Sequence, residues 1–206
     1  IDPCSAPFVD LYENEITRAV DLLPKLEIKI LVDASGSTRG YVMEVEKVFA
    51  SVIYQAFSMM ENDVQLYFFN SSNQEAVTTI IHTPSLHAIG NVQSNVANRD
   101  GAAIRFITRL FGSSNADFRI FIIITDGTPT AYKYGGEDAL ADTCHAMYTA
   151  GQQDIIIRYF NIGGLPELVK NSFKKYTDKM KIFFHPEELV KYAPVFINEL
   201  LEDMKL

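Results

Sequence analysis

Three short segments of the chain bring together acidic and hydroxyl side chains. DASGS (33–37) ends an apolar run, NRDG (98–101) precedes an expected helix, and TDG (125–127) ends a second apolar run. In folds that alternate strands and helices, ligands bind beyond the carboxyl ends of the strands, where the strand order reverses. If the two apolar runs are neighbouring strands, Asp33 and Asp126 lie together at that end of the sheet.

Two carboxylates in a partly buried crevice repel each other, and a shared proton or a cation relieves the repulsion. Ser35 and Ser37 follow Asp33 at alternate positions and add neutral oxygen ligands. An incomplete set of hard oxygen ligands suits Mg²⁺, which keeps several of its waters, and it also admits Mn²⁺ or Ca²⁺. The four histidines show no spacing typical of a zinc site. These residues therefore predict a magnesium site.

The elements that would position these residues alternate between strands and helices. Apolar runs predict strands at 27–33, 64–70, 76–83, 118–126, 154–162 and 180–184. Helical periodicity predicts helices at 6–23, 40–61, 101–112, 137–149, 166–176 and 186–204. We therefore expect an α/β fold: a doubly wound, Rossmann-like, mostly parallel six-stranded sheet with helices on both faces. The short SSNQE link after the second strand predicts a hairpin, and hence one antiparallel edge strand.

Composition narrows the class of protein. The chain has 206 residues, 48% of them apolar, which suits a lead-in helix or extension (1–25) and one domain (26–206). The net charge of −8 argues against a nucleic-acid surface and against binding to an anionic membrane. No apolar run has the roughly 18 residues that a membrane span needs. Because no secretion signal is visible, we expect a cytoplasmic location, while a secreted or surface fragment stays open.

The loop motifs resemble those of the von Willebrand factor A domain, over residues 26–205 of this chain. The D-x-S-x-S pattern of the first loop and the T-D-G of the third are similar to its metal-ion-dependent adhesion site. The resemblance implies the same fold and four metal ligands: Asp33, Ser35 and Ser37 from the first loop, and Asp126, acting through water, from the third.

The second loop departs from the adhesion-type pattern, in which a threonine is expected. Asp100 is the best candidate there, and NRDGAAIR (98–105) resembles the intracellular branch of the family. That branch includes cobalt- and magnesium-chelatase-type subunits and subunits paired with MoxR-type AAA+ ATPases. The segment FFHPEELVKYAPVFINELLEDM (183–204) also resembles the chelatase type. The narrower resemblance implies Asp100 as a fifth ligand and an AAA+ ATPase as the partner.

An aspartate in place of threonine adds a third negative charge to the site. Asp100 either fills the open coordination position of the cation, or leaves the site ready for a weaker, more reversible acidic ligand. A third alternative is that Asp100 only caps the helix that follows it, and Asp33, Ser37 and Asp126 have similar capping alternatives. The sequence leaves these alternatives open.

The functional hypothesis is a Mg²⁺-dependent protein-interaction module that binds a partner carboxylate and works with an AAA+ ATPase as a chelatase-like or remodelling subunit. Such a module would have no enzymatic activity of its own. The alternative is an adhesion or surface-recognition domain that binds an extracellular ligand through the same loops. A Mg²⁺-dependent hydrolase using Asp33 and Asp126 is a third hypothesis. The sequence contains no G-x-S-x-G elbow and no phosphate-binding loop to support it.

Overall fold

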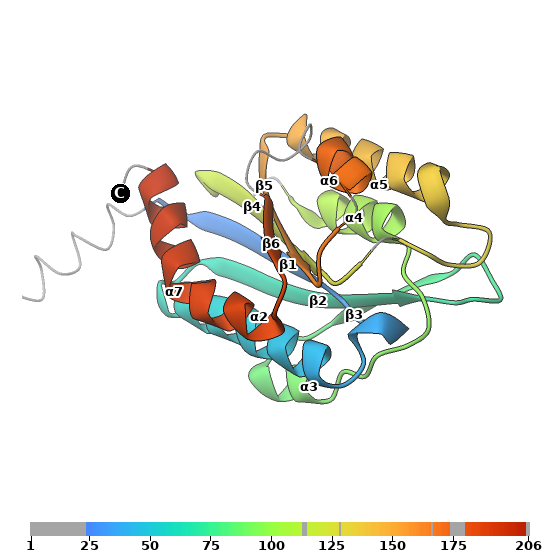
Figure 1. Cartoon of the computed structure of the whole chain (residues 1–206). Coiled ribbons are helices and arrows are strands. Elements are labelled where there is room, and N and C mark those ends of the chain that lie inside the picture. The colour runs from blue at the N-terminus through green and yellow to red at the C-terminus, as the bar shows by residue number, and fades with distance from the viewer. Residues whose placement is uncertain (1–23, 113–114, 128, 166, 174–179, 205–206) are drawn as a thin grey trace, which may run out of the picture.

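The computed structural model describes residues 24–112, 115–127, 129–165, 167–173 and 180–204. The helix expected over 6–23 lies outside these residues. Within them, helices cover both faces of a central twisted sheet (Figure 1). None of the described helices combines the length and the apolar character that crossing a membrane would need.

In the part of the chain described, six strands form one sheet in the order β3-β2-β1-β4-β5-β6. All neighbouring pairs are parallel except β2 and β3, which form the expected antiparallel hairpin at one edge. The strands are β1 (Leu26–Asp33), β2 (Asp63–Ser71), β3 (Thr78–His82), β4 (Phe118–Thr125), β5 (Ile155–Ile162) and β6 (Met180–Phe183). The predicted fold class is therefore confirmed, and most strand ends fall within one or two residues of the prediction.

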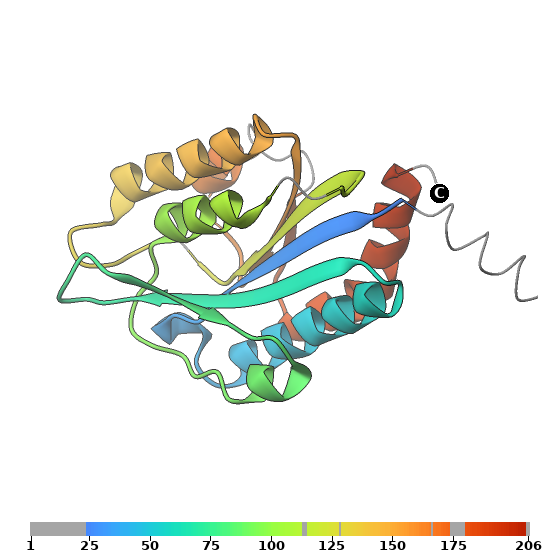
Figure 2. The same ribbon diagram turned by 180° about the vertical axis from the view of Figure 1, so that it is seen from behind.

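In the described part of the chain three helices lie on each face of the sheet, and Figures 1 and 2 show one set above the sheet and the other below it. On one face lie α2 (Tyr41–Met59), α3 (Leu86–Gly90) and α7 (Pro186–Asp203). On the other face lie α4 (Asp100–Leu110), α5 (Gly136–Gly151) and α6 (Glu167–Phe173). The sequence did not predict α3, because a helix of five residues is too short to show a helical period.

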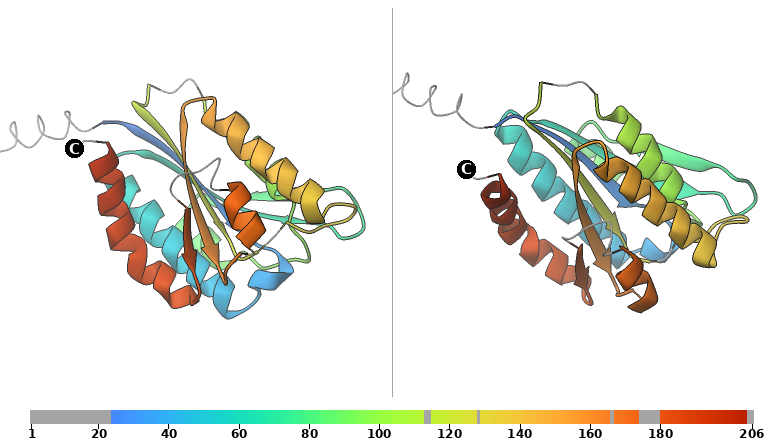
Figure 3. Two further views of the ribbon diagram at one scale, coloured as in Figure 1. Left: turned by 45° about the horizontal axis from the view of Figure 1, so that its top comes forward. Right: turned by 90° about the horizontal axis from the view of Figure 1, so that it is seen from above.

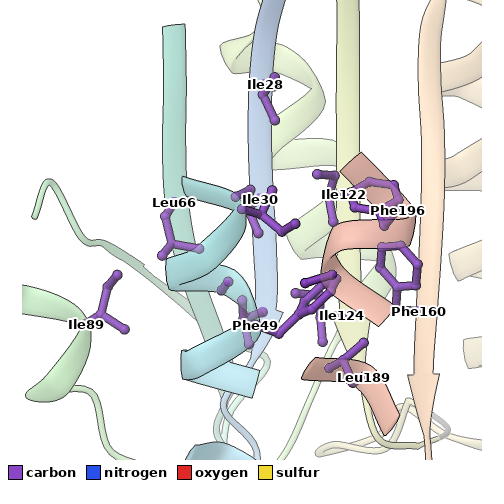
Figure 4. Close-up of a cluster of buried hydrophobic side chains, with 14 of the residues drawn as sticks. Ile28, Ile30, Phe49, Leu66, Ile89, Ile122, Ile124, Phe160, Leu189 and Phe196 are labelled. Atoms are coloured by element: carbon purple, nitrogen blue, oxygen red, sulfur yellow. The ribbon is translucent and has the colours of Figure 1, made fainter. Parts of the chain in front are cut away.

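The core under α2 and α7 consists of branched aliphatic strand residues and a group of aromatic rings (Figure 4). Phe160 of β5 packs edge-to-face against Phe196 of α7 at 5.0 Å and against Phe49 of α2 at 5.3 Å between ring centroids. Both faces of β1 and β4 are covered, which explains why β4 reads as a near-continuous apolar run, while β1 also contains the buried ion pair of Glu27 and Lys29. Burial on both faces fixes the ends of β1 and β4 relative to each other.

Helices α4 and α5 are joined by a pair of charged side chains. Arg105 donates to both carboxylate oxygens of Asp142, at 2.7 and 3.0 Å, and the Tyr134 hydroxyl donates to Asp142 Oδ2 at 2.9 Å. This Asp142 oxygen sits directly against Gly101, where a Cβ atom would lie only 2.1 Å from it. The glycine that follows Asp100 therefore allows α4 to approach α5 closely.

The strand order reverses between β1 and β4, at the centre of the sheet. After β1 the chain enters α2 on one face, and after β4 it enters α5 on the other, as the two views of Figure 3 show. The loops after these two strands diverge from a common point, which leaves space above the strand ends. This is the place at which the sequence predicted a ligand site.

Candidate metal site at the carboxyl ends of the central strands

The first loop leaves β1 at Asp33 and passes through a 3-10 turn, η1 (Gly36–Thr38), before α2 begins. Ala34 fixes the loop from two sides, because its N–H donates to the Phe69 carbonyl and its carbonyl accepts from the Asn95 N–H, each at 2.7 Å. A Cβ atom at Gly36 would lie 3.2 Å from the Asn95 carbonyl oxygen. The glycine in D-x-S-x-S therefore lets this loop pack against the segment before α4.

Hydrogen bonds join four of the five predicted ligands. The Ser35 and Ser37 hydroxyl oxygens are 3.0 Å apart, and the Ser37 hydroxyl donates to Asp126 Oδ1 at 2.8 Å. Asp33 Oδ1 accepts from the Ser35 N–H at 2.8 Å. The structure thus brings two carboxylates and two hydroxyls to one point above β1 and β4, as the sequence predicted.

Two further residues of the same motifs hold Asp33 in place. The Asn98 side-chain amide and the Thr125 hydroxyl each donate to Asp33 Oδ2 at 3.1 Å. The Asn98 N–H also donates to the Thr130 carbonyl, and Asn98 Oδ1 accepts from the Thr130 N–H, both at 3.0 Å. Asn98 therefore connects all three loops, a role that the sequence analysis missed. What could have indicated this role was the polar side chain at position 98 of the NRDG motif, but the sequence analysis considered only Asp100 there.

Asp100 is the first residue of α4, and its side chain is 2% exposed. Among the described residues neither of its carboxylate oxygens has a hydrogen-bond partner. It therefore does not cap α4, whose N-cap position is Arg99, and the interpretation of Asp100 as a cap alone is wrong. Asp100 is also not hydrogen-bonded to the four residues joined above.

Burial raises the pKa of all three aspartates, and repulsion by neighbouring carboxylates adds to it for Asp33 and Asp100. Burial, followed by the charge of Asp126, raises the pKa of Asp33 to about 7. Burial also raises the pKa of Asp100 well above its usual range, and the charges of Asp33 and Asp126 add to this effect. The pKa of Asp126 rises because of burial, although the Ser37 hydroxyl partly offsets this. The site therefore disfavours its own negative charge unless a cation is present.

The residues at this point fit a hard divalent cation. The donors are carboxylate and hydroxyl oxygens, which Mg²⁺, Mn²⁺ and Ca²⁺ prefer, and the buried oxygens of Asp100 lack a protein donor. In the described ranges, no group of three or more His, Cys, Asp and Glu side chains could hold a metal ion by itself. A cation here would therefore depend on Ser35, Ser37 and water as well as on the carboxylates.

Comparison with known proteins supports the fold. No family model and no curated protein sequence matches this chain. Among solved structures, the vWF domain of the type V pili tip protein Mfa5 from Porphyromonas gingivalis aligns with a TM-score of 0.66 at 8% identity. The alignment covers 89% of this chain and 96% of that one. This likeness establishes a von Willebrand factor A-like fold.

Two further neighbours are much longer than the present chain. The pilus adhesin SpaC from Lactobacillus rhamnosus GG aligns with a TM-score of 0.68 at 14% identity, over 88% of this chain and 30% of that one. Proximal thread matrix protein 1 from the mussel byssus, solved with a zinc-occupied MIDAS motif, gives a TM-score of 0.61 at 14% identity. There the alignment covers 84% of this chain and 47% of that one. None of these three is described as a chelatase-type subunit.

Proposed function

We propose that this domain is a divalent-cation-dependent interaction module that binds a carboxylate group of a protein partner. One observation supports this most directly: two strand ends and the first loop gather Asp33, Ser35, Ser37 and Asp126 at one point. Asp100 lies within electrostatic reach of Asp33 and Asp126, and its oxygens have no hydrogen-bond partner in the described chain. A cation would satisfy these oxygens and offset the repulsion between the aspartates.

The cation would be held by the first-loop residues and by Asp126 and Asp100, with Mg²⁺ proposed as the physiological ion. A bound divalent cation supplies a positive charge on which an outside carboxylate can be coordinated. Asn98 and Thr125 would keep Asp33 oriented toward it through the two hydrogen bonds to Oδ2. Asp100 then decides how strongly the site attracts an incoming acidic group, because its negative charge lowers the net charge of the occupied site.

The surface beside the first loop adds a second feature suited to an acidic partner. A polar cavity of about 500 Å³ lies next to the site and is lined in part by Arg39, Glu44 and Lys47. Lys47 is bound to Glu44 at 3.0 Å, whereas the exposed Arg39 side chain has no hydrogen bond or ion pair with the rest of the described chain. Arg39 is therefore available to a second acidic group of the same partner.

We propose surface adhesion as the setting of this module. The support comes from its structural neighbours, which include a pilus adhesin, a pilus tip protein and a byssus matrix protein. This setting would place the domain at a cell surface rather than in the cytoplasm. Partnership with a chelatase-like or MoxR-type AAA+ ATPase is the second candidate, and its support is the NRDGAAIR segment (98–105) with its aspartate in the second loop.

Calorimetric titration with Mg²⁺, Mn²⁺ and Ca²⁺ tests the cation site. Wild type should bind, and Asp33→Ala should not, because Asp33 is the residue to which the other loops are bonded. Asp63→Ala is the matched control, since this exposed aspartate lies at the start of β2, at the other end of the sheet. A wild type that binds none of the three ions would refute the proposal.

The open coordination position needs a separate probe. Protein loaded with Mn²⁺ should broaden the methyl resonance of added acetate, because a paramagnetic ion relaxes a carboxylate that binds to it. Acetamide serves as the uncharged control and should be broadened much less. If acetate is broadened only in Asp100→Ala, then Asp100 closes the site in the wild type and carboxylate capture is wrong.

A further inference from the structure

A fourth carboxylate lies behind the three aspartates of the site. Glu46 is on the buried face of α2, in line with Met43, Ala50 and Ile53, and its side chain is 0% exposed. All other residues of that line are apolar and belong to the core under α2 and α7. Glutamate is rarely fully buried unless it is paired, so its presence at this position needs an explanation.

No group in the described part of the chain forms a hydrogen bond with the Glu46 carboxylate. Among the residues that the structure describes, neither Oε1 nor Oε2 has a hydrogen-bond partner. The nearest cation in sequence, Lys47, is used elsewhere: it binds Glu44 at 3.0 Å and donates to the Gly90 carbonyl at 3.4 Å. Glu46 is thus a buried acid with two unused acceptor oxygens.

Helix α2 lies beside the elements that carry the metal site. Helix α2 packs on β1 and on η1, the turn that contains Ser37. Burial raises the pKa of Glu46 well above its usual range, and the charges of Asp33 at the end of β1 and Asp126 after β4 raise it further. Glu46 therefore lies within electrostatic reach of both strand ends, on the inner side of the site.

We propose that Glu46 is a functional part of the cation site, an inner carboxylate that supports the bound cation by its charge without being one of the loop ligands. This inference rests on the proposed cation binding. Without a cation, a neutral Glu46 is the form that its buried surroundings allow. A cation on the loop residues supplies the positive charge that lets Glu46 ionise, so that its negative charge adds to the affinity and its proton is released.

Two substitutions test this role by calorimetry and by thermal unfolding. Glu46→Gln keeps the shape and removes the charge, and Glu46→Leu also removes the buried polar group. Both should bind Mn²⁺ about tenfold more weakly, the factor that corresponds to one pKa unit. Titration in buffers of different ionisation enthalpy should show fewer protons released than in wild type. Cation-free Glu46→Leu should unfold at the same or a higher temperature than wild type.

The outcomes separate this inference from the proposed function. Glu202→Gln is the control, since it removes an exposed carboxylate near the end of α7 and should change neither affinity nor proton release. If wild type binds Mn²⁺ and both Glu46 variants bind it equally well with the same proton release, Glu46 is only a core residue and the inference is wrong. If wild type binds no cation, the proposed function and the inference both fail.

Discussion

The replacement Asp33→Asn gives the sharpest test of the electrostatics of the site, through its effect on the pH dependence of folding. Asp33 is fully buried, and its pKa of about 7 compares with an ordinary value of 3.8. In the unfolded chain this carboxyl ionises near its ordinary value, whereas in the folded, cation-free protein it keeps its proton up to neutral pH. Folding therefore favours the protonated form.

The sign and size of the effect follow from this difference. The contribution of Asp33 to stability is fully present below pH 3.8, is lost as the pH rises, and is gone above about pH 7. A difference of roughly three pKa units corresponds to about 4 kcal/mol in the free energy of unfolding. Cation-free wild type should therefore lose about 4 kcal/mol more than Asp33→Asn between pH 4 and pH 8.

Urea unfolding in EDTA at a series of pH values measures this difference. The variant also loses hydrogen bonds. In wild type, Ser35 donates to Asp33 Oδ1, and Asn98 and Thr125 donate to Oδ2, whereas an asparagine side chain has a single acceptor oxygen. That loss does not depend on pH, so the slope of stability against pH is the quantity to compare. Saturating Mg²⁺ should restore the stability of wild type at pH 8 and leave Asp33→Asn unchanged.

Parallel pH profiles would refute this reasoning. If cation-free wild type and Asp33→Asn lose stability equally between pH 4 and pH 8, then Asp33 is ionised at neutral pH without a cation. Its three hydrogen bonds would then be enough to stabilise the charge against burial and against Asp126, and the electrostatic argument for a cation would fail.

Two further predictions concern the framework that holds the site. Gly101→Ala should destabilise the protein by about 1–3 kcal/mol in urea unfolding, because its Cβ would lie 2.1 Å from Asp142 Oδ2. The same change should cost clearly less in an Asp142→Ala background, and an equal cost would contradict the steric explanation. Lys29→Met should cost about 3–5 kcal/mol, since it removes the buried cation that pairs with the Glu27 carboxylate at 3.0 Å and leaves that carboxylate to weaker contacts such as Arg119 at 3.8 Å. The double variant with Glu27→Gln should recover most of that loss, and no recovery would contradict the pairing argument.

Most of the fold could be predicted from the sequence because its hydrophobic patterns extend over many residues. A strand such as β4, buried on both faces, must read as a continuous apolar run, and α2 must repeat its apolar residues at helical spacing. These two signals were enough to predict a doubly wound sheet in which β1 and β4 are neighbouring strands. Helix α3 escaped prediction because its single turn depends on local contacts such as the bond from the Ala88 N–H to Ser85 Oγ.

The site could be predicted only where its residues lie close together in sequence. Asp33, Ser35 and Ser37 share one loop, and Asp126 ends the apolar strand that such a fold places next to β1. Asn98 could not be distinguished from its neighbours, because its role depends on three loops meeting in space. Sequence could indicate that a polar residue stood there, but not which carboxylate oxygen it would reach.

Glu46 shows most clearly what a sequence pattern hides. In the helical period of α2 it stands at a core position, where a polar residue usually reads as a break in the apolar stripe. Its significance comes from facts that only the fold supplies: complete burial, no partner for either oxygen in the described chain, and the nearby charges of Asp33 and Asp126. Four acids around one point are costly to fold without a cation, so selection for stability alone would favour an apolar residue here. That Glu46 stands there is therefore itself an argument that the charge at this end of the sheet serves binding.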